Sequence, residues 1–316
     1  CIALAYPDRV AQCTSTDGRR YRLRSGRAAL LDHNDPLRGS PFLAVAGVDA
    51  GRREGAIRLA APLTRDGVEA LFAAQIRSDR ELHWDQGRRD IAARRLRRLD
   101  ALVLEESTVG LSPDDPVIDL LLDQIRREGL AAFFADPLTL RARVQTARAL
   151  EPAGDWPDLS EPALLAGLES WLSPWLHSGE GAGQLRRLRL QEVLLGVLGR
   201  DRGRRLEEQL PTHFETPAGT RRQIQYALDG PPVLAVPLQE MLGVRETPRL
   251  AGGRLALVLH LLSPAGRPLQ VTSDLSAFWA GAYTEVKKEM RGRYPKHVWP
   301  DDPTTAAATR FSKRRR

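Results

Sequence analysis

The chain has 316 residues and a net charge of +7, with 42% hydrophobic and 28% charged side chains. These values are typical of a globular protein with two or three domains, and they exclude an intrinsically disordered chain. The 2 cysteines form no CxxC pair, no apolar run approaches the ~20 residues of a membrane span, and no signal peptide is visible. We therefore expect no disulfide framework, no metal site, no membrane contact and a cytoplasmic location.

Charge is distributed unevenly along the chain. Residues 1–111 carry 19 basic and 15 acidic side chains (net +4), and residues 280–316 carry 10 and 4 (net +6). The centre, residues 112–279, carries 18 and 21 (net −3). Because a polyanion is attracted to positive potential, the two ends are the better candidates for contact with one.

Residues 1–17 are interpreted as the end of a helical domain. The apolar start of the chain is followed by Tyr6 and Pro7, and a proline breaks a helix. The first residue is Cys1 rather than a methionine, and it lies in an apolar stretch. We therefore expect the N-terminal part of this domain to be missing.

A small β domain is expected over residues 18–111. The segment Arg20–Arg24 alternates strictly, so that as a strand it would turn Tyr21 and Leu23 to one face. Its opposite face would carry Arg20, Arg22 and Arg24. Further strands are predicted at Phe42–Val48, Ala56–Ala60, Glu81–Asp85, Ile91–Leu99 and Ala101–Glu105, with one helix at Val68–Ile76. Several short strands with one helix are typical of a small closed barrel such as an OB-fold.

Six arginines lie within the stretch Arg88–Arg98. A strand over Ile91–Leu99 would show arginines on both faces, and a helix over the same residues is the alternative. Trp84 stands in a polar setting beside these arginines; core packing is its favoured role, and base stacking is the other. The candidate nucleic-acid contacts of this domain are Arg20, Arg22, Arg24, Trp84, Arg88, Arg94 and Arg95.

Residues 112–210 have the pattern of a helical domain. Asp115–Pro116 and Asp136–Pro137 predict two helix starts, each with an acidic N-cap before a proline. Ser160 is expected to cap a third helix, on which Trp171 and Trp175 would share one apolar stripe and pack in the core. Two more helices are predicted near 184–199 and 201–210.

A mixed α/β unit is predicted over residues 211–303. Strands are expected at Arg222–Leu228, Val233–Leu238, Leu255–Leu262 and Pro268–Thr272, the last two as a hairpin. Residues 304–316 end in four consecutive basic side chains and have no apolar pattern, so a disordered basic tail is expected. The predicted fold class is thus α+β and multidomain: an OB-like barrel, a helical region and a mixed C-terminal unit.

One helix and the strip after it dominate this last unit. From Leu275 to Met290 the apolar side chains repeat with helical period, Asp274 stands at the N-cap position and Gly292 is the expected stop. Prolines at 295 and 300 hold the following strip extended. The strip and the end of the helix are basic and supply the other candidate nucleic-acid contacts, Lys287, Lys288, Arg291, Arg293 and Lys296.

Catalytic motifs are absent from the sequence. No glycine-rich loop ends in lysine as a P-loop does, and GxGxxG, HExxH and GxSxG are all missing. We therefore assign no catalytic, cofactor-binding or metal-binding residue, and we do not expect this chain to hydrolyse ATP alone.

Three stretches carry a resemblance to a known family. They are 232–243 (PVLAVPLQEMLG), 259–272 (LHLLSPAGRPLQVT) and 285–297 (EVKKEMRGRYPKH), followed by Trp299–Pro300. Together they resemble the C-terminal domain of HrpB-type bacterial DExH-box RNA helicases of the DEAH/RHA group. Val298 departs from the proline expected in that family between the histidine and the tryptophan.

The resemblance implies a domain order and a function. Residues 1–17 would end the ratchet domain, 18–111 would be the OB-fold region, and 211–303 the C-terminal domain. The parent family binds ATP and magnesium in two N-terminal RecA-like lobes, which have no counterpart here. The resemblance therefore implies an accessory region that binds single-stranded RNA, helps to shape the RNA channel and has the lobes as its partners.

A second hypothesis assigns the chain to another functional class. The helical centre and the C-terminal unit would dock a partner protein, without direct RNA binding, and the basic ends would only balance charge. An independent enzyme is disfavoured, because no acid–base or nucleophile constellation is present.

Overall fold

The alternation at Arg20–Leu23 forms a barrel strand, with Tyr21 and Leu23 buried inside and Arg20 and Arg22 exposed outside.

The computed structural model describes residues 1–49 and 54–311. It divides into two compact units, Cys1–Gln124 with His177–Gln184, and Ile125–Leu176 with Leu185–Arg316. The α+β fold class predicted from the sequence is confirmed.

Five strands close the barrel of the first unit, in the order β1-β2-β3-β5-β4. Their bounds are β1 (Val10–Cys13), β2 (Arg20–Leu23), β3 (Ala28–Leu30), β4 (Phe42–Val48) and β5 (Gly55–Leu63). The helix expected at the N-terminus is limited to α1 (Ile2–Ala5) and a 3-10 turn (Pro7–Arg9). β1 follows at once, because the backbone is extended again at Val10, where φ is −62° and ψ is 131°.

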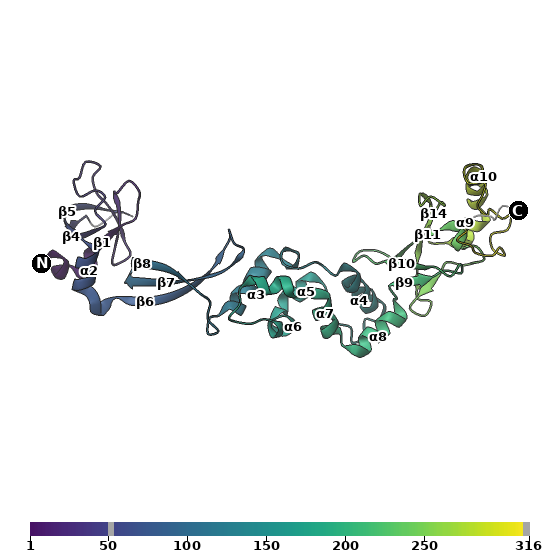
Figure 1. Cartoon of the computed structure of the whole chain (residues 1–316), viewed down its shortest axis with the longest axis horizontal. Helices are drawn as coiled ribbons and strands as arrows, with labels where there is room; N and C mark the ends of the chain where they lie inside the picture. Colours follow the sequence, from purple (N-terminus) through teal and green to yellow (C-terminus); the bar gives the residue numbers. More distant parts are fainter. Residues whose placement is uncertain (50–53, 312–316) are drawn as a thin grey trace. The chain divides into compact units, whose positions relative to one another are not determined.

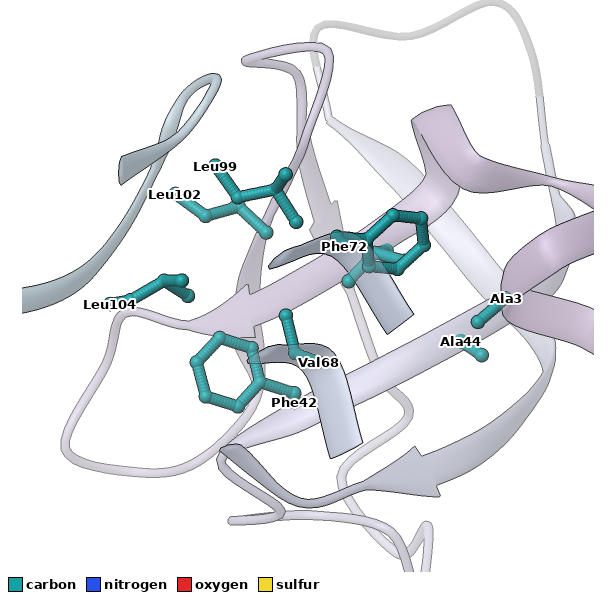
Figure 2. Packing of buried hydrophobic residues seen from close by; sticks show 9 residues of the cluster. Ala3, Phe42, Ala44, Val68, Phe72, Leu99, Leu102 and Leu104 are labelled. Atoms are coloured by element: carbon teal, nitrogen blue, oxygen red, sulfur yellow. The ribbon is translucent and has the colours of Figure 1, made fainter. Parts of the chain in front are cut away.

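A helix covers one end of the barrel. Thr64 caps α2 (Arg65–Phe72) by accepting the N–H of Gly67 at 3.1 Å, and the helix buries Val68 and Phe72. Figure 2 shows these two side chains packed with leucines that follow later in the chain. This core contains Ala3, Val10, Phe42, Ala44, Val68, Phe72, Leu99, Leu102 and Leu104.

A three-stranded antiparallel sheet extends from this core (Figure 1). It consists of β6 (Arg77–Asp85), β7 (Asp90–Leu99) and β8 (Leu102–Val109), so the strand alternative for residues 91–99 is confirmed and the helical one is wrong. The amide of Gln12 links β1 to β8 through two hydrogen bonds with the backbone of Val103, at 2.6 and 3.1 Å. These bonds and the shared core fix the sheet to the barrel.

Six helices form the centre of the chain: α3 (Val117–Glu128), α4 (Leu138–Leu150), α5 (Glu161–Ala166), α6 (Leu168–Trp171), α7 (Leu190–Leu198) and α8 (Arg200–Gln209). The expected N-cap role of Asp136 is wrong. Pro137 occupies the N-cap position without a side-chain bond, and the Asp136 carboxylate binds Arg141 at 2.7 Å instead.

One member of the stripe expected after Ser160, Trp175, is not in the core, whereas Leu172 and Leu176 are buried as expected. The segment changes to a 3-10 turn at Ser173–Trp175, which contains Pro174. A 3-10 helix has 3.0 residues per turn instead of 3.6, so Trp175 does not continue the buried face of Trp171. Trp171 is therefore buried, whereas Trp175 is 48% exposed.

The C-terminal sheet has the order β15-β14-β11-β10-β9. Its strands are β9 (His213–Glu215), β10 (Arg221–Gln225), β11 (Val233–Pro237), β14 (Val258–Leu262) and β15 (Pro268–Thr272), and a separate hairpin joins β12 (Arg249–Leu250) to β13 (Leu255–Ala256). The predicted hairpin partner of β14 is confirmed, because β15 pairs with it antiparallel.

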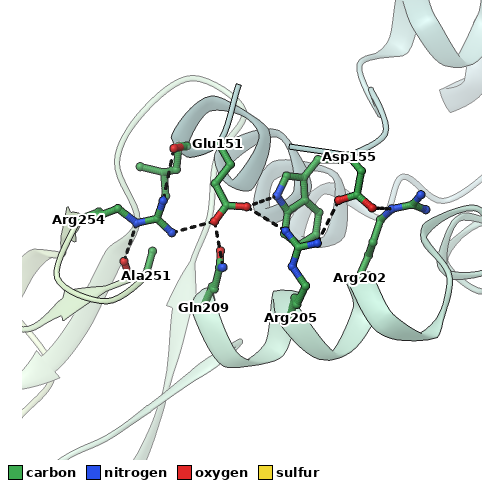
Figure 3. Close-up of polar contacts among 9 residues, drawn as sticks. Glu151, Asp155, Arg202, Arg205, Gln209, Ala251 and Arg254 are labelled. Carbon is green, nitrogen blue, oxygen red and sulfur yellow. Dashed lines mark hydrogen bonds and ion pairs between the residues drawn. The ribbon is translucent and has the colours of Figure 1, made fainter. Parts of the chain in front are cut away.

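One carboxylate joins the helical centre to the β12–β13 hairpin (Figure 3). Glu151, just after α4, accepts hydrogen bonds from Trp156, Arg205, Gln209 and Arg254 at 2.8 to 3.1 Å. The bonds from Trp156, Arg254 and Gln209, in that order of effect, lower the pKa of Glu151 to about 2. Because its donors come from α8 and from the β12–β13 turn, Glu151 holds these elements together.

The expected helix over 275–290 is two helices, α9 (Leu275–Ala280) and α10 (Tyr283–Arg293). The break lies at Gly281, whose φ of −122° and ψ of −90° are not helical. Most of the apolar stripe is still buried (Leu275, Phe278, Trp279, Tyr283 and Met290), and Trp279 and Tyr283 meet edge to face across the break at 5.2 Å. Gly292 does not stop α10, which continues to Arg293.

The predicted cap of α9 is confirmed and gives a stability prediction. Asp274 accepts the N–H of Ala277 at 2.9 Å. We expect Asp274→Ala to lower the free energy of unfolding by about 1 kcal/mol, because this N–H loses its acceptor. Urea denaturation measures the change, with Asp274→Asn as the control that retains a capping oxygen; equal losses in both variants would contradict the capping role.

The chain after Pro303 lies against the loop that follows β11. Gly243 donates its N–H to Pro303 at 2.8 Å, and Thr309 donates to Gln239 at 3.0 Å. Residues 304–311 therefore have fixed contacts, whereas the basic residues Lys313–Arg316 lie outside the described part of the chain. Among the helices of the described residues, none is long and apolar enough to cross a membrane.

Candidate nucleic-acid interface

The arginines of β2 and Arg24, the residue after it, differ in their contacts. Arg24 is held by Asp100 and Gln75, and its guanidinium lies 5.0 Å from the centre of the Phe72 ring. Arg20 pairs with Glu54 at 2.6 Å on the surface. Arg22 is exposed and its side chain contacts no charged or hydrogen-bonding group among the described residues. Of these three arginines, only Arg22 is without a side-chain partner in the described chain, while Arg24 has a structural role.

Arg94 lies at the centre of an ion-pair network on one face of the β6–β8 sheet. It pairs with Glu81 of β6 at 3.1 Å and with Glu106 of β8 at 3.0 Å, and Arg98 pairs with Glu81 at 2.5 Å. The hydrogen bonds that Arg94 donates to Glu106 and then to Glu81 raise its pKa. Because cross-strand pairs neutralise it, Arg94 is better explained as a brace of the sheet than as a phosphate contact.

Two of the three other candidates of this sheet are more accessible than Arg94. Arg95 of β7 is exposed between Arg80 and Ser107 of the neighbouring strands, and its side chain pairs with no acidic group in the described chain. Arg88 is exposed in the turn between β6 and β7. Trp84 is half-buried on β6, opposite Ile91. Arg88 and Arg95 are therefore free to meet a phosphate.

The lysines and arginines of α10 and of the strip after it also fall into two groups. Lys287 binds Asp301 at 2.9 Å, and Arg293 lies 3.9 Å from Glu289, one turn earlier. The other three, Lys288, Arg291 and Lys296, are exposed and form no ion pair among the residues the structure describes. Arg291 is still close enough to Asp301 to help lower the pKa of that carboxylate, after the effect of Lys287. Lys288 and Arg291 are three residues apart and so share one helix face.

The aromatic strip after α10 has a mainly structural role. Trp299 is buried and donates its indole N–H to the Tyr294 carbonyl at 3.0 Å. Tyr294 meets His297 edge to face at 6.2 Å. Tyr283 donates its hydroxyl to Pro300 at 2.8 Å. The strip is thus fixed to α10, and its cations rather than its rings face solvent.

Two further exposed arginines of the barrel unit were not among the predicted nucleic-acid contacts. Arg27 lies between β2 and β3, and Arg77 lies at the start of β6. The side chains of both lack partners in the described chain. β6 begins at Arg77, four residues before the predicted strand, so Arg77 did not join the candidates. No group of three metal-ligating side chains exists within the described ranges.

Residues 171–303 match the family described as ATP-dependent helicase C-terminal, HrpB_C. The whole chain is 38% identical over 317 residues to the ATP-dependent RNA helicase HrpB of Escherichia coli (strain K12). That match covers 99% of this chain and 39% of the relative.

Two solved structures are similar to this chain. The crystal structure of the E. coli DExH-box NTPase HrpB has 38% identity and a TM-score of 0.63, and the match covers 98% of this chain and 39% of that one. The crystal structure of the Escherichia coli DEAH/RHA helicase HrpB has 36% identity and a TM-score of 0.54, covering 94% and 37%. Over nearly its whole length, the chain is therefore homologous to the C-terminal region of HrpB-type helicases, as residues 232–300 predict.

Proposed function

We propose that the chain is the accessory C-terminal region of an ATP-dependent RNA helicase. It contributes contacts to single-stranded RNA and helps to shape the RNA channel, whereas ATP and magnesium are bound by N-terminal RecA-like lobes of the same protein, in the cytoplasm. The observation that carries this proposal is the set of exposed arginines without acidic partners on the barrel unit, above all Arg22 and Arg95. Unpaired guanidinium groups on strands can bind phosphates and release counterions.

The basic face of α10 is a second candidate contact in the other unit. Lys288 and Arg291 of α10 and Lys296 of the strip after it are exposed and form no ion pair in the described chain. Lys287 and Arg94 are not included, because each is neutralised by a carboxylate.

Salt dependence of RNA binding tests the proposal. For a single strand, the logarithm of the affinity falls with the logarithm of salt concentration with a slope of about −0.7 per phosphate contact. We expect Arg22→Glu/Arg95→Glu to weaken binding of a single-stranded oligonucleotide by about tenfold and to reduce the slope by about 1.4. Fluorescence anisotropy of a labelled oligonucleotide measures both quantities.

Arg200→Glu is the matched control, since Arg200 is an exposed arginine of α8 without an acidic partner among the described residues. It should change neither the affinity nor the slope. Lys288→Glu/Arg291→Glu measures the α10 face separately. If the unmodified chain shows no binding even at low salt, the RNA proposal fails and the protein-interaction module is favoured instead.

A further inference from the structure

A cavity opens in the helical part of the second unit, between the starts of α4 and α7. Its volume of about 530 Å³ lies within the range of roughly 300–1,000 Å³ that is typical of ligand pockets. The lining is mixed, with apolar side chains beside charged ones. Phe134 and Leu185 are buried, whereas Phe133 and Leu188 are half-buried and leave apolar surface accessible.

Both carboxylates at the lining of this cavity are paired, which leaves one cation of the lining without an acidic partner. Asp136 is neutralised by Arg141 at 2.7 Å, and Glu192 by Arg189 at 3.3 Å. The fourth charged group at the lining, Arg186, is exposed, and no acidic side chain of the described chain pairs with it. A ligand that places a carboxylate at Arg186 would therefore meet an unpaired cation.

An apolar track continues from the cavity along α7. Glu192 lines the cavity, and Leu195 and Gly196 follow on the same exposed face one turn later, about 6 Å along the helix axis. Leu195 is 42% exposed, and Trp175, 48% exposed, lies against Gly196. We call the cavity, Arg186, Leu195 and Trp175 the α7 surface.

We propose that the α7 surface docks an acidic segment of a partner protein, which inserts an aromatic or large aliphatic side chain into the cavity and packs a second one on Trp175. Exposed tryptophan and arginine beside an apolar pocket are the residue types that dominate binding energy at protein interfaces. The unpaired Arg186 is the cation of the lining that would meet a carboxylate of this segment. This surface is separate from the cations proposed to contact RNA.

A peptide selection on the full chain tests the proposal. A random peptide library displayed on phage is selected against the immobilised chain, and the enriched peptides are synthesised for fluorescence anisotropy. We expect peptides that combine Asp or Glu with Phe, Trp or Leu. Their affinity should fall by about tenfold or more in Arg186→Glu and in Trp175→Ala, as for central contacts of an interface.

Two control variants are matched to these changes. Arg200→Glu reverses an exposed arginine on α8, and Leu228→Ala truncates an exposed apolar side chain after β10; neither should change peptide binding. Circular dichroism and thermal unfolding establish that each variant is folded. Since Arg186 has no acidic partner in the described chain, its reversal tests the surface even if Trp175→Ala is unstable.

Several outcomes would overturn the proposal. These are the absence of enriched peptides, peptides without acidic bias, and equal binding by all variants. Dimerisation of the chain that Arg186→Glu abolishes, measured by ultracentrifugation, would make the α7 surface an interface between two copies. Photocrosslinking of single-stranded RNA to Trp175 would assign it to nucleic acid.

Discussion

Replacing Arg222 by leucine is expected to destabilise the C-terminal sheet by about 3 kcal/mol, because it leaves a buried carboxylate unpaired. Glu240 has a side chain that is 3% exposed, and it receives both Nε and Nη2 of Arg222. Burial raises the pKa of Glu240, but hydrogen bonds from Arg222 and Thr220 outweigh it and hold the pKa below its usual value. Urea denaturation of the single variant measures the loss.

A double-mutant cycle separates this charge effect from a loss of packing. Adding Glu240→Gln to Arg222→Leu removes the unpaired charge and should restore about half of the lost free energy. Arg221→Leu is the control, since Arg221 is the exposed neighbour on β10 and its side chain has no partner in the described chain; it should change stability by less than about 0.5 kcal/mol. Equal effects of the Arg221 and Arg222 variants would refute the role of the buried pair.

The second large effect is expected at Glu151. Glu151→Gln keeps the shape of the side chain but removes the charge that accepts bonds from Trp156, Arg205, Gln209 and Arg254. We expect a loss of about 2 kcal/mol at neutral pH, since hydrogen bonds to charged groups exceed neutral ones. Urea unfolding followed by tryptophan fluorescence measures this loss in the free energy of unfolding.

The loss at Glu151 should depend on pH in a defined direction. The pKa of its carboxylate is 4.5 without perturbation and about 2 in the folded chain. A depressed folded pKa stabilises the protein above the unfolded value, and this contribution disappears as pH falls through the folded value. The difference between the native protein and Glu151→Gln should thus be complete above pH 4.5 and shrink toward pH 2.

Glu208→Gln is the control for this titration. Glu208 lies on α8 near the Glu151 network, but it is exposed and has no side-chain partner in the described chain. Its replacement should shift stability little at any pH. A difference between Glu151→Gln and the native protein that stays constant down to pH 2 would contradict the linkage.

Local patterns in the sequence predict much of this fold, because they reflect local physics. The alternation around Tyr21 and Leu23 predicts β2 with the correct buried face. β1 was missed because Tyr6 and Pro7 suggested only the end of a helix, and β3 because its three residues are too few for a pattern. Trp175 was expected in the core, since a helical period cannot show where Pro174 changes the helix type.

The candidate interface was less predictable, for a physical reason. Whether an arginine is free depends on carboxylates that are distant in sequence. Arg24 meets Asp100, and Arg94 meets Glu81 and Glu106, only because strands pair. Arg22 and Arg95 have the same local context as Arg24 and Arg94 but no such partner in the described chain. The sequence identifies the basic strands, and the pairing of strands decides which of their cations are available.

The segment His177–Gln184 has a consequence for any attempt to divide this protein. It belongs to the barrel unit, although helices of the other unit precede and follow it. Ala182 donates its N–H to Asp90 at 2.6 Å, beside the turn of the β6–β7 hairpin. The chain passes between the units near residues 124, 176 and 184, so one protease cut cannot release either unit. A truncation after Gln124 would remove His177–Gln184, which is part of the same compact unit as Cys1–Gln124.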